Sequence, residues 1–214
     1  MRVKKTRFVQ RNRGRLLVSA LLLLVLCWQW GTAFGIELKA QLAQVLIERA
    51  WQQKLVAPEL SAAPWPWADT QPVARLQWLD AEGRVLKDLY VLSGGHGQAL
   101  AFGPGLLDGS QMQGARVVGG HRDTHFEFLR NTERGDRLRW QDTNGRWRTY
   151  RISRQSIADA SRESLWVEPA QDSLWLVTCY PFDAVVPRGS LRYVVRADRV
   201  ELPSPSRGRY QASI

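Results

Sequence analysis

The sequence predicts a mainly β domain that is preceded by one membrane-spanning helix, and three observations carry this prediction. An uncharged stretch of 21 residues, 16–36, directly follows a strongly basic N-terminus. From Pro72 onward, short β-prone runs alternate with turn signals at a spacing typical of an antiparallel barrel or sandwich. Little of that part has helical periodicity. A length of 214 residues accommodates one such domain and an N-terminal appendage.

The net charge of +10 is concentrated at the N-terminus. Residues 1–15 hold seven basic side chains and no acidic one, while the rest of the chain is nearly balanced. As a helix, residues 16–36 would be about 31 Å long, which matches a bilayer core of about 30 Å. Basic residues before an apolar span hold the N-terminus in the cytoplasm, and Trp28 and Trp30 suit the far interface. The charge therefore indicates membrane topology, and nucleic acid is not a predicted partner.

We accordingly predict a cytoplasmic N-terminus over 1–15 and a single-pass anchor over 16–36, with the remaining chain on the extracytoplasmic side of the inner membrane. A cleaved signal peptide with its apolar core at 16–26 is the alternative. Bulky Trp28 and Trp30 stand where small residues normally prepare cleavage, so the sequence favours a retained anchor.

A helix and a linker are predicted over 37–71. Apolar residues recur there at helical spacing, namely Leu38, Leu42, Val45, Leu46 and Trp51. Pro58 ends this helix, and the Pro- and Trp-rich stretch 63–72 is predicted to be extended. We expect the helix to pack on its own domain or to serve as a stalk. Binding to a membrane surface or a partner is the alternative.

About eight strands are predicted over 72–200. The Asn144-Gly145 turn between two alternating runs is a strong hairpin signal. The β-prone runs are VARLQWL, RVLKDLYVL, RVVGG, RLRWQ, RWRTYRIS, SIAD, SLWLVT and LRYVVRA. Residues 201–214 form a Pro- and Ser-rich tail that we predict to be loose.

The two cysteines, Cys27 and Cys179, cannot form a disulfide if Cys27 lies in the membrane span. A single thiol in an oxidising compartment is a liability unless it is buried or chemically employed. The position of Cys179 at the end of a strand-like run leaves both interpretations open.

The sequence contains three histidines that could pair with this thiol: His96, His121 and His125. His121 follows Gly119-Gly120 at the end of a β-run, where glycines permit a sharp bend. The HxxxH pair of His121 and His125 has no evident third ligand, so no metal site and no cofactor are predicted. A Cys–His pair is the better use, because an imidazole can accept the thiol proton and later donate one to an amine leaving group.

An arginine is the predicted stabiliser of negative charge at such a site. Arg192 comes 13 residues after Cys179 on the next β-run, so an adjacent returning strand would bring the two side by side. A guanidinium there would stabilise the oxyanion of acyl transfer. Arg188 is closer to Cys179 in sequence and competes for this role, although it lies in a Pro-Gly loop.

The segments LWLVTC, GGH and LRYVV occur in the order that resembles the sortases, the cysteine transpeptidases of bacterial surfaces. The stretches PWPWADTQPVARL, LAFGPG, GHRDTHFEFL, GDRLRW and LVTCYPFDA resemble the Gram-negative-type class of that family. The resemblance covers roughly residues 15–197 and implies a sortase-type closed β-barrel. It also implies catalytic roles for Cys179 as nucleophile, His121 as general acid and base, and Arg192 as oxyanion stabiliser. Thr178 would support substrate binding.

The function implied by this resemblance is cleavage of a Leu-Pro-X-Thr-Gly-like (LPXTG-like) C-terminal signal of a secreted protein. A thioester acyl-enzyme would form and transfer the protein to an amine acceptor. The alternative is a non-catalytic anchored β-domain that binds a surface polymer or an assembly partner, with Cys179 as a packed core thiol. An L,D-type cell-wall transpeptidase is less consistent with the sequence, because 58 positions separate His121 from Cys179.

Overall fold

The computed structural model describes residues 3–107, 114–162, 172–184 and 189–200. The chain divides into two compact units, residues 1–45 and 46–214. A long helix, α1 (Val3–Val56), begins in the first unit and ends in the second. The predicted tail, 201–214, lies outside the described residues.

Within the described residues, no helix carries an apolar stretch long enough to cross a bilayer. The membrane anchor over 16–36 therefore remains a prediction.

Within the second unit, the end of α1 is buried through one residue that was expected, Trp51, and through Ile47 and Ala50, which were not. The side chains of Ile47, Ala50 and Trp51 are buried, and the Trp51 ring lies 6.5 Å from the Tyr90 ring between centroids. The expected apolar residues Leu38, Leu42 and Val45 are instead exposed. The prediction of a helix was correct. Which of its apolar side chains are buried depends on where the rest of the domain contacts it, and the helical period alone does not determine this.

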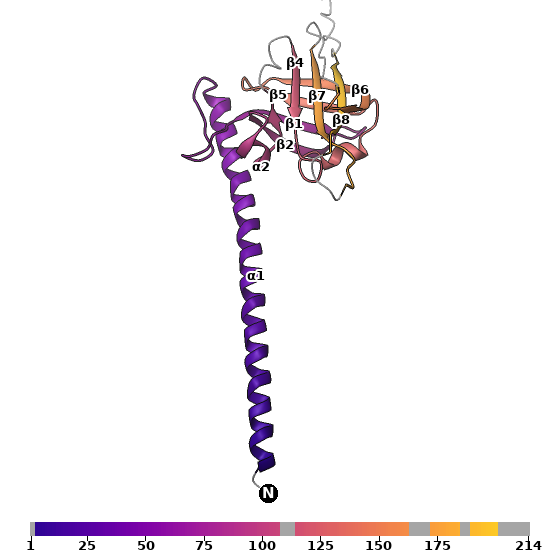
Figure 1. The fold of residues 1–214 in the computed structure, drawn as a ribbon. Coiled ribbons are helices and arrows are strands. Elements are labelled where there is room, and N and C mark those ends of the chain that lie inside the picture. Colours follow the sequence, from indigo (N-terminus) through magenta and orange to yellow (C-terminus); the bar gives the residue numbers. More distant parts are fainter. Residues whose placement is uncertain (1–2, 108–113, 163–171, 185–188, 201–214) are drawn as a thin grey trace, which may run out of the picture. The chain divides into compact units, whose positions relative to one another are not determined.

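In the described part of the chain, eight strands form one closed barrel in the order β1-β2-β3-β4-β7-β8-β6-β5. Figure 1 shows β4, β7 and β8 side by side. Two neighbouring pairs, β2–β3 and β4–β7, are parallel, and the other pairs are antiparallel. The strands are β1 (Pro72–Leu79), β2 (Val85–Ser93), β3 (Gly105–Leu106), β4 (Ala115–Gly119), β5 (Arg137–Gln141), β6 (Trp147–Asp159), β7 (Ser173–Cys179) and β8 (Leu191–Arg199).

Alternating side chains explain why these segments become strands of a barrel. One face of each strand is apolar and fills the interior, as Leu174 and Leu176 do on β7 and Val195 and Ala197 do on β8. These residues have an exposed fraction of zero. The predicted hairpin is confirmed, because β5 and β6 pair directly around a turn in which Gly145 has a φ of +77°.

Two features of the barrel differ from the sequence prediction. SIAD is the end of the 13-residue strand β6, which pairs with β8 as far as Asp159↔Leu191. The eighth strand is instead β3, whose two residues bridge β2 and β4. Two short helices, α2 (Gly97–Phe102) and η2 (Glu127–Asn131), also lie between strands. Segments of two to six residues carry too little periodicity to be recognised from sequence.

Candidate active site

Cys179 is the last residue of β7, and its side chain is exposed. On this strand, Leu174 and Leu176 fill the barrel interior, whereas Trp175 and Val177 belong to a second apolar cluster. Because side chains alternate along a strand, Cys179 continues the row of Trp175 and Val177. The thiol therefore lies on the outer face of the barrel and is open to solvent.

Arg192 lies directly opposite Cys179 in the antiparallel pair β7–β8. Side chains of directly opposed residues share one face of the sheet, so the Arg192 and Cys179 side chains both lie on the outer face. The Arg192 Nη1 donates to the carbonyl oxygens of Gly189 (2.7 Å) and Leu191 (2.9 Å). The prediction that the returning strand brings Arg192 beside Cys179 is confirmed. Arg188 lies outside the described residues.

His121 follows β4, the parallel neighbour of β7 on its other side (Figure 1). The register pairs Gly119 with Val177, so His121 and Cys179 each come two residues further along neighbouring strands. Parallel neighbours lie about 4.8 Å apart, which places both residues at the same end of the barrel. His121 is exposed, like Cys179.

Contacts between the two chains continue past the end of β4. The Gly120 N–H donates to the Val177 carbonyl (3.1 Å), and the Thr178 hydroxyl donates to the Gly120 carbonyl (2.7 Å). The Gly120 backbone passes so close to the buried Phe126 ring that a Cβ there would lie 2.8 Å from it. Thr178 is itself buried, so its side chain does not face solvent. It holds the backbone of Gly120, the residue before His121.

His125 ties the other side of this loop to α2. The side chain is half-buried, and the imidazole donates a hydrogen bond to the Ala101 carbonyl. Burial lowers the pKa of His125, and the proximity of His121 and Lys87 lowers it further. A neutral His125 therefore connects the loop of His121 to α2.

Arg122 is a residue of this site that the sequence prediction missed. Its Nη1 donates to the Pro181 carbonyl (2.8 Å), and its Nη2 donates to the Ala184 carbonyl (2.7 Å). The two carbonyls belong to the segment that follows Cys179, so Arg122 bridges the histidine loop and the cysteine loop. A single arginine in a loop carries no sequence signal for such a contact.

An apolar cluster on the outer face leads toward the thiol. Trp175 fills its centre: the indole N–H donates to the Ser173 hydroxyl (3.0 Å), and the Arg196 guanidinium lies 5.3 Å from the ring centroid. The buried members are Ala115, Val117, Trp175 and Val194, with Leu107, Ala158 and Val177 packed at the edges. Because β4, β7 and β8 are adjacent, this buried cluster packs on the same outer face of the sheet as Cys179 and Arg192.

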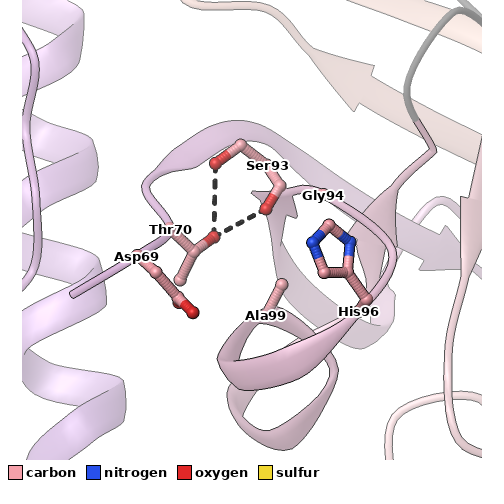
Figure 2. Close-up of a pocket in the computed structure, with 6 residues that line it drawn as sticks. All are labelled: Asp69, Thr70, Ser93, Gly94, His96 and Ala99. Atoms are coloured by element: carbon pink, nitrogen blue, oxygen red, sulfur yellow. Dashed lines mark hydrogen bonds between the residues drawn. The ribbon is translucent and has the colours of Figure 1, made fainter.

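A cavity of about 260 Å³ lies at the junction of the linker, β2 and α2 (Figure 2). The Asp69 carboxylate and the His96 ring lie on different sides of it. The Thr70 hydroxyl donates to the Ser93 carbonyl (2.8 Å). The lining residues are Asp69, Thr70, Ser93, Gly94, His96 and Ala99, so this cavity is separate from the site at Cys179. Among the described residues, no group of three His, Cys, Asp or Glu side chains is arranged to hold a metal ion.

The fold and the site thus define a closed β-barrel with an exposed cysteine between a histidine and an arginine from its two neighbouring strands. The sequence matches the model of the sortase domain over residues 83–200, which is more than half of the chain. The chain belongs to the sortase family.

Among characterised proteins, sortase D of Bacillus subtilis (strain 168) is 36% identical over 88 residues. That match covers 41% of this chain and 43% of the relative, so the chain spans less than half of the length of the relative that it matches.

Solved sortases share the fold. Sortase A from Corynebacterium diphtheriae superposes with a TM-score of 0.53 at 22% identity, covering 77% of this chain and 86% of that one. A Clostridium perfringens sortase C, solved with its C-terminal cell wall sorting motif, gives a TM-score of 0.52 at 15% identity, with coverages of 77% and 90%.

Proposed function

We propose that this protein is a cysteine transpeptidase that cleaves an LPXTG-like C-terminal signal of a secreted protein and transfers that protein to an amine. The observation that carries the proposal is the placement of exposed Cys179 opposite Arg192 and beside His121 at one end of the barrel. The sorting motif bound to the Clostridium perfringens sortase C supports this substrate class. The narrower assignment to the Gram-negative-type class rests on the sequence motifs alone.

In the first half of the proposed reaction, neutral His121 accepts the Cys179 thiol proton as the sulfur attacks the threonine carbonyl carbon of the signal. The Arg192 guanidinium stabilises the oxyanion of the tetrahedral intermediate through charge-assisted hydrogen bonds. The carbon–nitrogen bond to glycine then breaks, and protonated His121 donates its proton to the leaving amine. A thioester joins Cys179 to the secreted protein.

In the second half, an amine attacks the thioester carbonyl while neutral His121 accepts its proton. A new amide bond forms, the carbon–sulfur bond breaks, and Cys179 regains a proton.

The test is cleavage of a fluorogenic peptide that contains the signal, with mass spectrometry to detect the acyl-enzyme. We expect Cys179→Ala to abolish cleavage and the covalent adduct while the circular dichroism spectrum is unchanged. Cys27→Ser is the matched control and should retain both. Cleavage by the Cys179→Ala variant at the wild-type rate would disprove the proposal.

The alternative of a non-catalytic binding domain requires a packed core thiol at position 179, and the exposure of Cys179 disfavours it. A thiol reagent should therefore modify Cys179 in the native protein at a rate close to that in urea.

We further propose that residues 16–36 anchor the protein in the inner membrane with the N-terminus in the cytoplasm. The uncharged stretch after seven basic residues supports this. Carbonate extraction of membranes should leave the chain in the pellet, and protease added outside spheroplasts should digest the barrel. Release by carbonate would contradict the anchor.

A further inference from the structure

We propose that Arg122 is a positioning residue that fastens the loop of His121 to the segment after Cys179 and thereby sets the approach of the imidazole to the thiol. The proposal rests on the proposed function, because it assigns Arg122 a task within the same site.

The two hydrogen bonds of Arg122 use the planar fork of its guanidinium. One nitrogen donates to the Pro181 carbonyl and the other to the Ala184 carbonyl, at 2.8 and 2.7 Å. The Ala184 N–H points back to the Pro181 carbonyl (3.4 Å), so these carbonyls are the two ends of one turn. A single guanidinium thus holds both ends of the turn that begins two residues after Cys179.

The other attachments of the histidine loop do not duplicate this contact. The hydroxyl of Thr178 holds the loop at its base, through Gly120. His125 holds the far side, through Ala101. Arg122 adjoins His121 in sequence and connects the loop to the chain beyond the thiol. Without it, the loop would still be attached to β7 through Gly120, but not to the segment that follows Cys179.

The positive charge of Arg122 strengthens its hydrogen bonds to the Pro181 and Ala184 carbonyls and is not used in an ion pair with a described residue. In the described part of the chain no carboxylate lies within ion-pair distance of Arg122. A lysine would keep the charge, but its ammonium is a point donor that does not reproduce the fork. Arg122→Lys should therefore restore only part of what Arg122→Gln loses.

Arg130 provides a matched control. Its guanidinium lies 5.4 Å from the Phe182 ring centroid, and it donates to the Phe182 carbonyl at 3.5 Å. It touches the same turn as Arg122 but belongs to η2, so Arg130→Gln removes a guanidinium from this turn without detaching the loop of His121.

The first measurement is the pH dependence of alkylation of Cys179 by iodoacetamide, on the full chain carrying Cys27→Ser. We expect the profile of the parent protein to differ from that of His121→Ala, because the imidazole influences the thiol. Arg122→Gln should give the His121→Ala profile, Arg122→Lys an intermediate one, and Arg130→Gln the parent profile.

The second measurement is cleavage of the fluorogenic peptide. Arg122→Gln should lower kcat on the order of 10- to 100-fold, as misplaced catalytic groups do, with KM within about twofold. A lowered fraction of folded protein would instead give two kinetic phases of alkylation, in which the folded fraction keeps the parent profile.

These measurements distinguish a failure of the positioning role of Arg122 from a failure of the proposed function. If the parent and His121→Ala profiles differ and Arg122→Gln retains the parent profile, the positioning role of Arg122 is wrong while the proposed function stands. If the parent and His121→Ala profiles coincide and no peptide is cleaved, the proposed function itself fails. Should Arg122→Gln not fold, the Arg122→Lys profile decides, and a parent-like profile there overturns the proposal.

Discussion

Cys179 and Arg192 are directly opposed residues of the antiparallel pair β7–β8, which places their side chains on the same outer face of the barrel. Neither residue could be placed there by its own strand alone. The register between β7 and β8 pairs Arg192 with Cys179. The parallel register between β4 and β7 brings His121 to the same end of the barrel as Cys179.

Arg192→Lys should lower kcat for peptide cleavage on the order of 100-fold, which is typical for the loss of an oxyanion donor. Lysine keeps the charge but loses the planar donor geometry. Thermal unfolding should change little, because among the described residues Arg192 is bonded to carbonyls of its own loop, Gly189 and Leu191. Near-normal turnover in a steady-state assay would transfer the stabilising role to Arg188.

Gly120→Ala should destabilise the protein by about 1–3 kcal/mol, because the new Cβ would lie 2.8 Å from the Phe126 ring. Phe126 is fully buried and has no free space to move into, so the backbone that carries His121 must shift. Urea unfolding measures the stability, and peptide cleavage should fall in parallel.

Gly119→Ala is the matched control for this substitution. Its Cβ would meet only the Leu107 side chain at an ordinary 3.8 Å. We expect a change within about 0.5 kcal/mol. Equal losses for the two variants would show that general strand strain, and not the contact with Phe126, is responsible.

Asp172→Asn should destabilise the protein at neutral pH by about 2 kcal/mol, because the carboxylate is a shared acceptor. It accepts hydrogen bonds from Arg116 (2.7 Å), Tyr150 (2.8 Å) and Arg199 (2.9 Å). Burial raises the pKa of Asp172, but the bonds from Tyr150 and Arg116 outweigh it and hold the pKa below 3.8. A lowered carboxyl pKa stabilises the fold above 3.8, and this stabilisation is lost as the pH falls through the lower native value.

The difference between wild type and Asp172→Asn in urea unfolding should therefore shrink at pH 3 relative to pH 7. Arg199→Gln removes only the more exposed partner and should cost less than about 1 kcal/mol. A wild-type advantage that stays constant across this pH range would contradict the assignment.

His125 should make the fold sensitive to mild acid. Burial and the neighbouring His121 and Lys87 lower its pKa below 6.5. As the pH falls below 6.5, the unfolded chain binds a proton that the folded chain resists, so stability is complete above this value and declines below it. His125→Gln keeps a donor for the Ala101 carbonyl without titrating.

The measurement is the free energy of unfolding at pH 7.5 and 5.5. Wild type should lose more stability between these values than His125→Gln does. Identical slopes would show that His125 titrates as it does in the unfolded chain.

Most strands of the barrel and the candidate residues of its site could be predicted from the sequence. Alternating residues identified seven of the strands, because a strand with one buried face leaves a period-2 pattern. The Asn144-Gly145 turn indicated the hairpin for a similarly local reason. Cys179, His121 and Arg192 stood out because the first ends, the second follows and the third lies near the start of a recognisable run within a motif that resembles the sortases.

The tertiary structure decided what depends on pairing between distant segments. The two-residue strand β3 exists because β2 and β4 flank it, and SIAD belongs to β6 because β8 offers partners along its whole length. The contacts of Arg122 and His125 join loops that are far apart in sequence and that have no periodicity. By itself, the sequence determined which residues can carry the chemistry, since side-chain type and local pattern are written in it. Only the closed barrel decided which of them meet, because register and loop contacts are set by the packing of the whole domain.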